Sequence, residues 1–247
     1  MKKFWKENSH EAYLWAAEFM NYPEIPFGSY LREILRKTDV VADVGCGFGV
    51  PALFMASLCS RVIAIDQDPY ALRVLDLEKE KRGITNVETR LSQWPDVEME
   101  PCDVVVSFYH NRFAETAENV QKILNIAKRG GIMTSQGPAC LPTLAEKILP
   151  MLGLEVPRES CQNGCYAKSR LEAAGLNVEC RQIIHDFSQP VRNQEEAAAY
   201  ISSHLKLGEE HQEKLVRILP KILTCKGNQL LIPILRENCL LTWERSC

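Results

Sequence analysis

The chain has 247 residues, of which 46% are hydrophobic and 25% are charged, and its formal net charge at pH 7 is −3. This length suits one globular domain, and the average composition excludes collagen-like, low-complexity and wholly disordered chains. A dedicated nucleic-acid binder usually carries an excess of basic residues. Because no such excess is present, we expect no nucleic-acid partner.

Several features predict a protein of the cytoplasm. The opening residues, Met1 to Glu7, are rich in charge and do not lead into the apolar core of a secretory signal. The longest stretch without a charged residue lies between Asp43 and Arg61, and glycines and a proline interrupt it, so we expect no membrane span. The 10 cysteines are too few for a disulfide scaffold and are expected to be reduced. The composition leaves the oligomeric state open between monomer and homodimer.

The first two thirds of the chain predict two helices followed by alternating strands and helices. Residues 9–20 have the pattern of an amphipathic helix with Ser9 at its N-cap, and a second helix is expected over 29–36 after a loop at 21–28 that contains two prolines and a glycine. Apolar runs predict strands, and periodic segments predict helices between them: strands at 40–44, 61–66, 87–91, 103–107 and 131–134, and helices at 51–59, 69–82 and 115–127. Near-continuous apolar strands separated by helices indicate a parallel sheet covered on both faces, which is the α/β class.

The last third of the chain has a different pattern. A helix over 167–174 ends at Gly175, and a strand is expected over 177–187. Residues 193–219 are rich in Glu, Ala and Leu and have helical periodicity, and a last strand is expected over 238–244. We therefore expect a single domain with four parts: a helical cap (1–38), a core (39–187), a helical insertion that packs on the sheet or serves as a lid (188–228), and a segment with the final strand (229–247).

A glycine-rich loop after the first predicted strand carries the strongest indication of function. It is Asp43-Val44-Gly45-Cys46-Gly47-Phe48-Gly49, whose glycines allow a tight turn and let backbone N–H groups approach a ligand at the carboxyl end of the sheet. Asp66 ends the next strand, at the spacing expected of an acid that binds ribose hydroxyls. A dinucleotide site would have Gly-x-Gly-x-x-Gly, but here Val50 occupies the last of those positions and Pro51 follows.

These residues together resemble the class I S-adenosylmethionine-dependent methyltransferases. The resemblance covers about residues 38 to 187 and the end of the chain, with Ile65-Asp66-Gln67-Asp68-Pro69 similar to the family's second motif, and it is closest to the branch that methylates small molecules. It implies a Rossmann-like, doubly wound sheet of seven mostly parallel strands, in the order 3-2-1-4-5-7-6 with the seventh strand antiparallel. It also implies S-adenosylmethionine as the methyl donor and a small-molecule acceptor.

The resemblance further implies which residues contact the cofactor. Asp66 would bind the ribose, and the residues that end the third strand would flank the adenine. Many relatives have an acid near Gln93, whose amide can still bond the exocyclic amine, and Trp94 could pack on the ring. The expected cofactor-binding residues are Asp43, Gly45, Cys46, Gly47, Gly49, Asp66, Gln67, Ser92, Gln93, Trp94, Ser107 and Tyr109.

Phe108-Tyr109-His110 follows the fourth strand, where the transferred methyl group would point. Methyl transfer from a sulfonium depends mainly on positioning and water exclusion, and it needs a base only where the acceptor must first lose a proton. Tyr109 and His110 are therefore the candidate catalytic residues. The alternative is that Tyr109 only lines the pocket and His110 is a surface or loop residue.

Other side chains could reach the same cleft. His185 could face it or be a satisfied structural histidine, while Arg112 and Arg192 could hold an anionic acceptor or be solvated. An N-terminal aromatic group could fold over the acceptor or simply pack on the sheet: Trp5, Tyr13, Trp15, Tyr22 and Tyr30. The Asn/Asp-Pro-Pro-Tyr/Phe motif of relatives that methylate nucleic-acid or protein amides is absent after the fourth strand, which argues against those acceptors.

Two alternatives and one further site complete the interpretation. Cys161 and Cys165 suggest a metal site, but no second ligand pair is close in sequence to complete a tetrahedral set, so we expect no metal. The protein could bind S-adenosylmethionine without catalysis, as a regulator or partner subunit. Less favoured is an NAD-dependent oxidoreductase, because Val50 and Pro51 do not suit a pyrophosphate.

Overall fold

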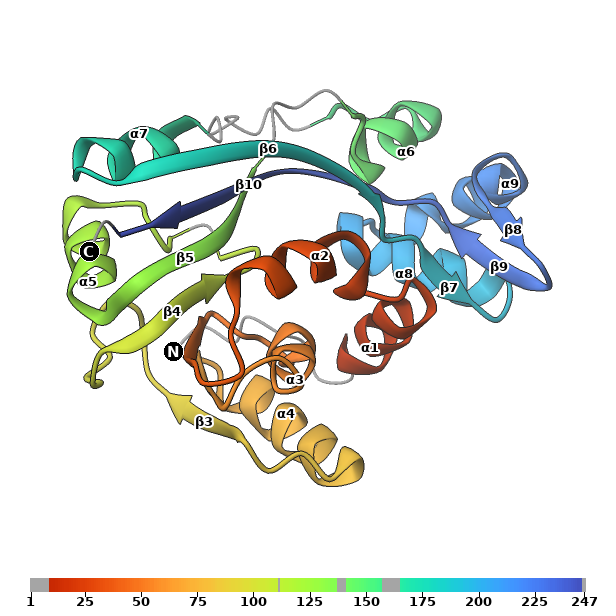
Figure 1. The fold of residues 1–247 in the computed structure, drawn as a ribbon. Helices are drawn as coiled ribbons and strands as arrows, with labels where there is room; N and C mark the ends of the chain where they lie inside the picture. Colours follow the sequence, from red (N-terminus) through yellow and green to blue (C-terminus); the bar gives the residue numbers. More distant parts are fainter. Residues whose placement is uncertain (1–8, 111, 137–140, 157–164, 246–247) are drawn as a thin grey trace.

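The computed structural model describes residues 9–110, 112–136, 141–156 and 165–245, which form a large sheet flanked by helices and a smaller sheet beside it (Figure 1). The large sheet has seven strands in the order β3-β2-β1-β4-β5-β10-β6. Their bounds are Val40–Val44 (β1), Arg61–Asp66 (β2), Val87–Leu91 (β3), Cys102–Ser107 (β4), Ala127–Gln136 (β5), Asn177–Asp186 (β6) and Leu235–Glu244 (β10).

The strand directions confirm the predicted fold class. β1 pairs in parallel with β2 and β4, β2 with β3, and β4 with β5. β10 runs antiparallel to both β5 and β6, so the last strand of the chain inserts between them. This is the order that the resemblance implies, and it brings the carboxyl ends of β1, β2 and β4 to one edge of the sheet.

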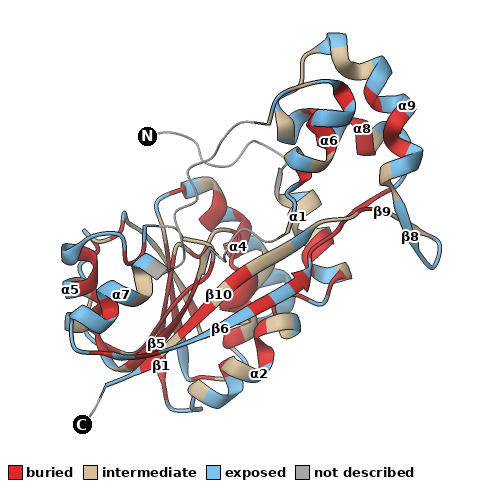
Figure 2. Cartoon of the chain, turned by 90° about the horizontal axis from the view of Figure 1, so that it is seen from above, coloured by how far each residue is buried: buried red, intermediate tan, exposed pale blue. Residues whose placement is uncertain are grey.

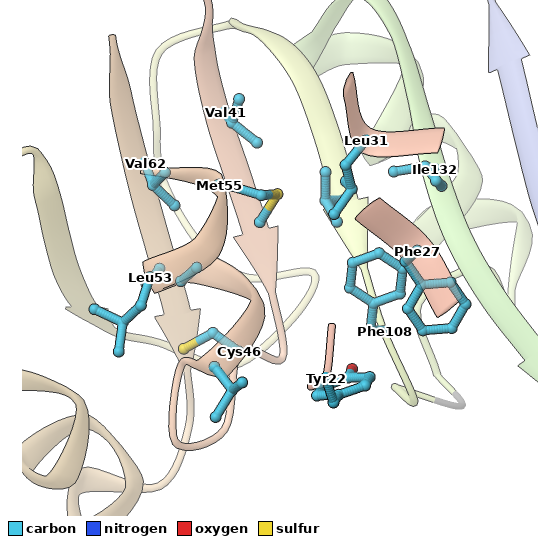
Figure 3. Close-up of a cluster of buried hydrophobic side chains, with 14 of the residues drawn as sticks. Tyr22, Phe27, Leu31, Val41, Cys46, Leu53, Met55, Val62, Phe108 and Ile132 are labelled. Atoms are coloured by element: carbon cyan, nitrogen blue, oxygen red, sulfur yellow. The ribbon is translucent and has the colours of Figure 1, made fainter. Parts of the chain in front are cut away.

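Helices cover both faces of this sheet. One face carries α2 (Glu24–Ile34), α3 (Val50–Met55) and α4 (Pro69–Arg82), and the other carries α5 (Ala117–Ile126) and α7 (Cys165–Ala173). Figure 3 shows the first face, where Phe27 and Leu31 of α2 pack near Ile132 of β5 and near Phe108, which follows β4. The burial of both faces explains why the central strands β1, β2 and β4 are apolar over most of their length.

The helix α2 begins earlier than expected. The prediction of a loop over 21–28 is wrong in its second half, because the helical segment starts at Glu24. Pro26 lies in its first turn, where a backbone N–H has no helical partner to lose, and Ile25 departs from helical geometry with φ −103° and ψ 118°. Together with α1 (Ser9–Phe19), α2 forms the expected helical cap.

The insertion before the last strand contains the expected helices and also short strands. The helices are α8 (Gln194–Leu205) and α9 (Gln212–Ile222), and α6 (Leu144–Leu152) packs with them. The strands β7 (Gln189–Val191), β8 (Thr224–Lys226) and β9 (Gln229–Ile232) form the smaller antiparallel sheet. Figure 2 shows buried residues on the inner sides of these helices, so this subdomain has a core of its own.

None of the helices in the described part of the chain combines the length and the apolar character that a membrane crossing requires.

Candidate active site

The glycine loop connects β1 to α3 at the carboxyl edge of the sheet. Gly45, Gly47 and Gly49 all have positive φ, at 73°, 53° and 74°, a conformation that favours glycine. The backbone N–H groups of Gly45 and Cys46 donate to the Ile65 carbonyl at 2.8 and 3.0 Å. A Cβ on Gly49 would collide with the Leu75 side chain of α4. The loop is therefore held close to the end of β2 and its turn requires glycine.

Asp66 joins this loop to the start of α4. One carboxylate oxygen accepts the N–H of Gly47 at 2.8 Å, and the other accepts the N–H of Asp68 at 2.9 Å. Asp68 in turn caps α4 by accepting the N–H of Tyr70 at 2.9 Å. A carboxylate has about four lone-pair positions, so Asp66, which is half-buried, can accept further hydrogen bonds from a ligand.

Asp43 lies under the same loop in a different environment. Its side chain is 1% exposed, and its Oδ2 has no hydrogen-bond partner among the described residues. Burial, and to a lesser extent the nearby charge of Asp66, raise the pKa of Asp43 to about 7. A buried carboxyl without a donor beside a glycine loop is a group that a ligand's N–H could satisfy.

Tyr109 connects three strands of the sheet through its backbone and hydroxyl. Its N–H donates to the Thr134 hydroxyl at 2.7 Å, and its own hydroxyl lies 2.7 Å from His185 Nε2. The Asn238 amide donates to the same hydroxyl at 3.2 Å. Burial lowers the pKa of His185 to about 4, so its neutral ring can accept a hydrogen bond from the Tyr109 hydroxyl at Nε2. His185 is thus a satisfied histidine that also borders Tyr109.

His110 lies against the glycine loop. A Cβ built on Gly45 would come within 2.8 Å of His110 Cγ, so only glycine leaves room for the ring. His110 Nδ1 is buried, and no described residue hydrogen-bonds to it. Burial lowers the pKa of the imidazole. His110 is therefore a half-buried loop residue whose ring lies against the glycine loop.

The residues expected around the adenine differ in what they offer. The Ser92 N–H donates to the Asp66 carbonyl at 3.0 Å, and Gln93 and Gln67 are exposed. Trp94 is buried at 7% exposure, and its Nε1 donates to the Phe113 carbonyl at 2.9 Å. Its ring is packed in the core instead of standing free beside a ligand.

Two further residues of the predicted site, Ser107 and Cys46, are buried and contact other parts of the fold. The Ser107 hydroxyl donates to the Val44 carbonyl at 2.8 Å and is buried, so it ties β4 to β1. The polar groups of Ser107 and Trp94 thus have partners within the fold, and a contact of either residue with the cofactor stays a prediction. Cys46 is buried in the main core, and burial raises the pKa of its thiol well above the ordinary value, which keeps it protonated.

The N-terminal aromatic residues cover this edge of the sheet. The Tyr13 ring centroid lies 5.7 Å from that of Phe48 and 5.7 Å from that of Phe187. The Tyr22 ring stacks on His185 at 6.3 Å, close to Tyr109. The helical cap therefore packs directly over the side chains that follow β4. Trp5 lies outside the described residues.

Arg112 and Arg192 are surface side chains. Arg112 pairs with Glu115 at 3.7 Å, and Arg192 pairs with Glu196 at 3.5 Å, each with a glutamate three or four residues along the chain. No local sequence pattern marks Arg236, whose Cζ lies 3.7 Å from the Phe187 ring centroid and 4.9 Å from that of Tyr109. The predicted last strand began at Asn238, so Arg236 fell outside it; the longer β10 places it at the site.

Cys161 and Cys165 were the candidates for a metal site. Cys161 lies outside the described residues, as does the side chain of Cys165. Within the described ranges, no group of three or more His, Cys, Asp or Glu side chains could hold a metal ion.

A family model described as a methyltransferase domain matches residues 35–217 of the chain. The chain belongs to this methyltransferase family. The matched residues include the glycine loop, Asp66, Tyr109, His110 and His185, and they end within the insertion. The predicted resemblance to the class I methyltransferases is thereby confirmed.

Two curated relatives are methyltransferases by name. The protein named Probable cobalt-precorrin-6B C(15)-methyltransferase (decarboxylating) of Methanothermobacter thermautotrophicus is 30% identical over 124 residues, which are 46% of this chain and 64% of that protein. The ribosomal protein L11 methyltransferase of Desulforamulus reducens is 33% identical over 111 residues, 44% of this chain and 35% of that protein. The chain thus spans less than two thirds of the length of each relative.

Solved structures agree on the fold. The YcgJ protein from Bacillus subtilis aligns with a TM-score of 0.57 at 14% identity, covering 90% of this chain and 98% of that one. At this identity the likeness concerns the fold alone.

Proposed function

We propose that this methyltransferase transfers a methyl group from S-adenosylmethionine to a small-molecule acceptor. The observation that carries the proposal is the hydrogen bond between the glycine loop and Asp66, in which the Gly47 N–H donates to the carboxylate at 2.8 Å. When bound, S-adenosylmethionine would supply a methyl group that is already activated on a sulfonium sulfur.

The residues at the loop fit this cofactor. Gly45, Gly47 and Gly49 let a ligand approach the main chain, and the spare lone pairs of Asp66 suit the two hydroxyls of a ribose. The unpartnered Oδ2 of Asp43 suits the ammonium of the cofactor's amino-acid part. Ser92 and Gln93 directly follow β3, whose last residue Leu91 pairs with Asp66, and they would border the adenine.

The enclosure near Tyr109 favours a small acceptor. Tyr22 and Phe187 are buried there, and Tyr13 contacts both Phe48 of the glycine loop and Phe187. Side chains from the cap, the sheet and the strand ends thus pack together around Tyr109. Small-molecule sites are typically concave and lined by apolar and aromatic groups with a few polar ones. The named relatives include both a cobalt-precorrin and a ribosomal-protein methyltransferase, so the preference for a small molecule depends on this enclosure.

We assign different roles to the two candidate catalytic residues. The Tyr109 hydroxyl hydrogen-bonds to His185, and burial raises the pKa of the phenol. Tyr109 therefore orients the acceptor and does not take a proton from it. His110 is neutral and has an unpartnered Nδ1 beside Gly45. Where the acceptor must lose a proton before methylation, His110 is the group that can receive it.

A transfer experiment tests the proposal. Purified protein would be incubated with S-adenosylmethionine carrying a labelled methyl group, together with either a pool of small metabolites or a protein extract. We expect label in the small-molecule fraction and a matching yield of S-adenosylhomocysteine, both lost in Asp66→Ala. Label confined to the protein fraction would contradict the small acceptor, and binding of the cofactor without transfer from either pool would favour a regulator or partner subunit.

A further inference from the structure

Arg236 lies at the centre of the candidate acceptor region. It is on β10, directly opposite His185 of β6 in the antiparallel register. Its guanidinium stacks on the Phe187 ring at 3.7 Å and reaches to 4.9 Å from the Tyr109 ring centroid. The side chain is half-buried, so its charge points toward this region and not into open solvent.

The charge of Arg236 has no counterion in the described structure. Arg112, Arg181 and Arg192 each pair with a glutamate, whereas no carboxylate of the described ranges lies within 4.0 Å of the Arg236 guanidinium. Stacking on aromatic rings compensates a cation only in part. Partial burial of an unpaired charge is costly, so a ligand that supplies a negative charge would stabilise this side chain.

The tyrosines and histidines on which the Arg236 charge acts come from several elements. Its charge lowers the pKa values of groups on the cap, the strand ends and α8: Tyr13, Tyr22, Tyr109, His185, Tyr200 and His204. Burial keeps these tyrosines protonated and these histidines unprotonated at neutral pH, so none of them balances the guanidinium. Arg236 therefore faces a region bounded by the cap, the sheet and the insertion.

We propose that Arg236 binds a carboxylate of the methyl acceptor, so that the substrate class is a carboxylate on an apolar, ring-containing body. A guanidinium presents two parallel N–H groups that match a carboxylate, and the rings of Phe187 and Tyr109 hold it in place. The inference depends on the proposed methyl transfer, because it assigns the acceptor of that same site. Tyr109, whose hydroxyl lies beside the guanidinium, would border the group to be methylated.

The test compares carboxylates with their neutral amides. The probes are hydroxy-, amino- and mercaptobenzoates and the matching benzamides, titrated calorimetrically into protein saturated with S-adenosylhomocysteine. We expect at least one benzoate to bind 10-fold or more tightly than its amide, and Arg236→Gln to remove that preference. Arg236→Lys should keep only part of it, since an ammonium lacks the paired geometry. Labelled methyl transfer to the preferred benzoate should show a raised KM in Arg236→Gln.

Controls separate a binding role from a structural one. Arg112→Gln removes a surface arginine and should change neither preference nor affinity. The affinity for S-adenosylhomocysteine should stay the same in Arg236→Gln, which shows that the variant is folded. No binding of any benzoate by protein that binds S-adenosylhomocysteine, or an acid-over-amide preference that survives Arg236→Gln, would overturn the inference. Failure of the unaltered protein to bind S-adenosylhomocysteine would overturn the proposed function instead.

Discussion

Asp43 and Asp66 are two carboxylates at one loop with opposite environments. Asp66 is half-buried and accepts two backbone N–H groups, whereas Asp43 is buried and its Oδ2 has no described donor. Backbone donors favour the charged form of a carboxylate, while burial favours the neutral form. The two residues should therefore respond differently to substitution.

Replacement of Asp66 by alanine should weaken the binding of S-adenosylhomocysteine. The variant loses the carboxylate that accepts the Gly47 N–H and the proposed bonds to ribose. Hydrogen bonds to a charged group contribute about 1.5–3 kcal/mol, so we expect roughly a 10- to 150-fold loss of affinity by calorimetry. Asp96→Ala, at an exposed carboxylate on a nearby loop, is the control. Equal affinities for Asp66→Ala and the unaltered protein would remove Asp66 from the site.

Asp43 should make the ligand-free protein less stable as the pH rises. Its pKa is raised from 3.8 to about 7 in the folded state, so between these values the folded state holds a proton that the unfolded state has released. Folding stability then falls as the pH rises through that window, by roughly 4 kcal/mol in all. We expect Asp43→Asn to lack this loss, so that urea unfolding shows a larger relative gain for the variant at pH 8 than at pH 4.5. A pH-independent difference between the two proteins would show that Asp43 is charged in the folded state throughout.

At the scale of elements, Tyr109 links the turn after β4 to β5, β6 and β10. Tyr109→Phe would leave His185 Nε2 and the Asn238 amide without their shared partner in a buried setting. Buried groups that lose a partner cost about 1–3 kcal/mol, and we expect a loss of that size in the free energy of unfolding. Tyr166→Phe, on an exposed face of α7, should change it by less than about 0.5 kcal/mol. Similar stabilities of the two variants would mean that the Tyr109 hydroxyl contributes no net hydrogen bonding.

Sequence patterns predict best the elements whose formation depends on residues within and next to them. β1, β2, β3 and α4 have the expected bounds, because unbroken apolar runs, Asp68 at an N-cap and Gly83 after the last turn are local signals. The start of α2 differs from the expected loop because proline is tolerated in the first turn of a helix. The short strands β7, β8 and β9 of the smaller sheet were missed because three or four residues carry too little periodicity.

The candidate site was predicted less completely than the fold. The glycine loop and Asp66 meet as expected, since both follow strands that pair in parallel. Sequence patterns do not predict the hydrogen bonds of Trp94 and Ser107, because the accepting carbonyls, those of Phe113 and Val44, are distant in sequence. Arg236 likewise depends on the register of β10 against β6, which no local pattern encodes.

At the scale of the whole molecule, the large sheet and the subdomain with the smaller sheet have separate hydrophobic cores. The large sheet buries its own clusters, and the subdomain buries a separate one that includes Ile201 and Leu219. Leu219 is fully buried, so Leu219→Ala should cost about 2–5 kcal/mol within the subdomain. Hydrogen exchange should then speed up in α8 and α9 while β1 and β2 keep their protection. Uniformly faster exchange in both regions would indicate a single cooperative unit.

Calorimetric titration with S-adenosylhomocysteine tests the central claim most directly, with NADH as the control ligand. The loop between Asp43 and Asp66 predicts micromolar binding of S-adenosylhomocysteine and no binding of NADH. Binding of NADH alone, or of neither ligand, would contradict the assignment of the loop and with it the proposed methyl transfer.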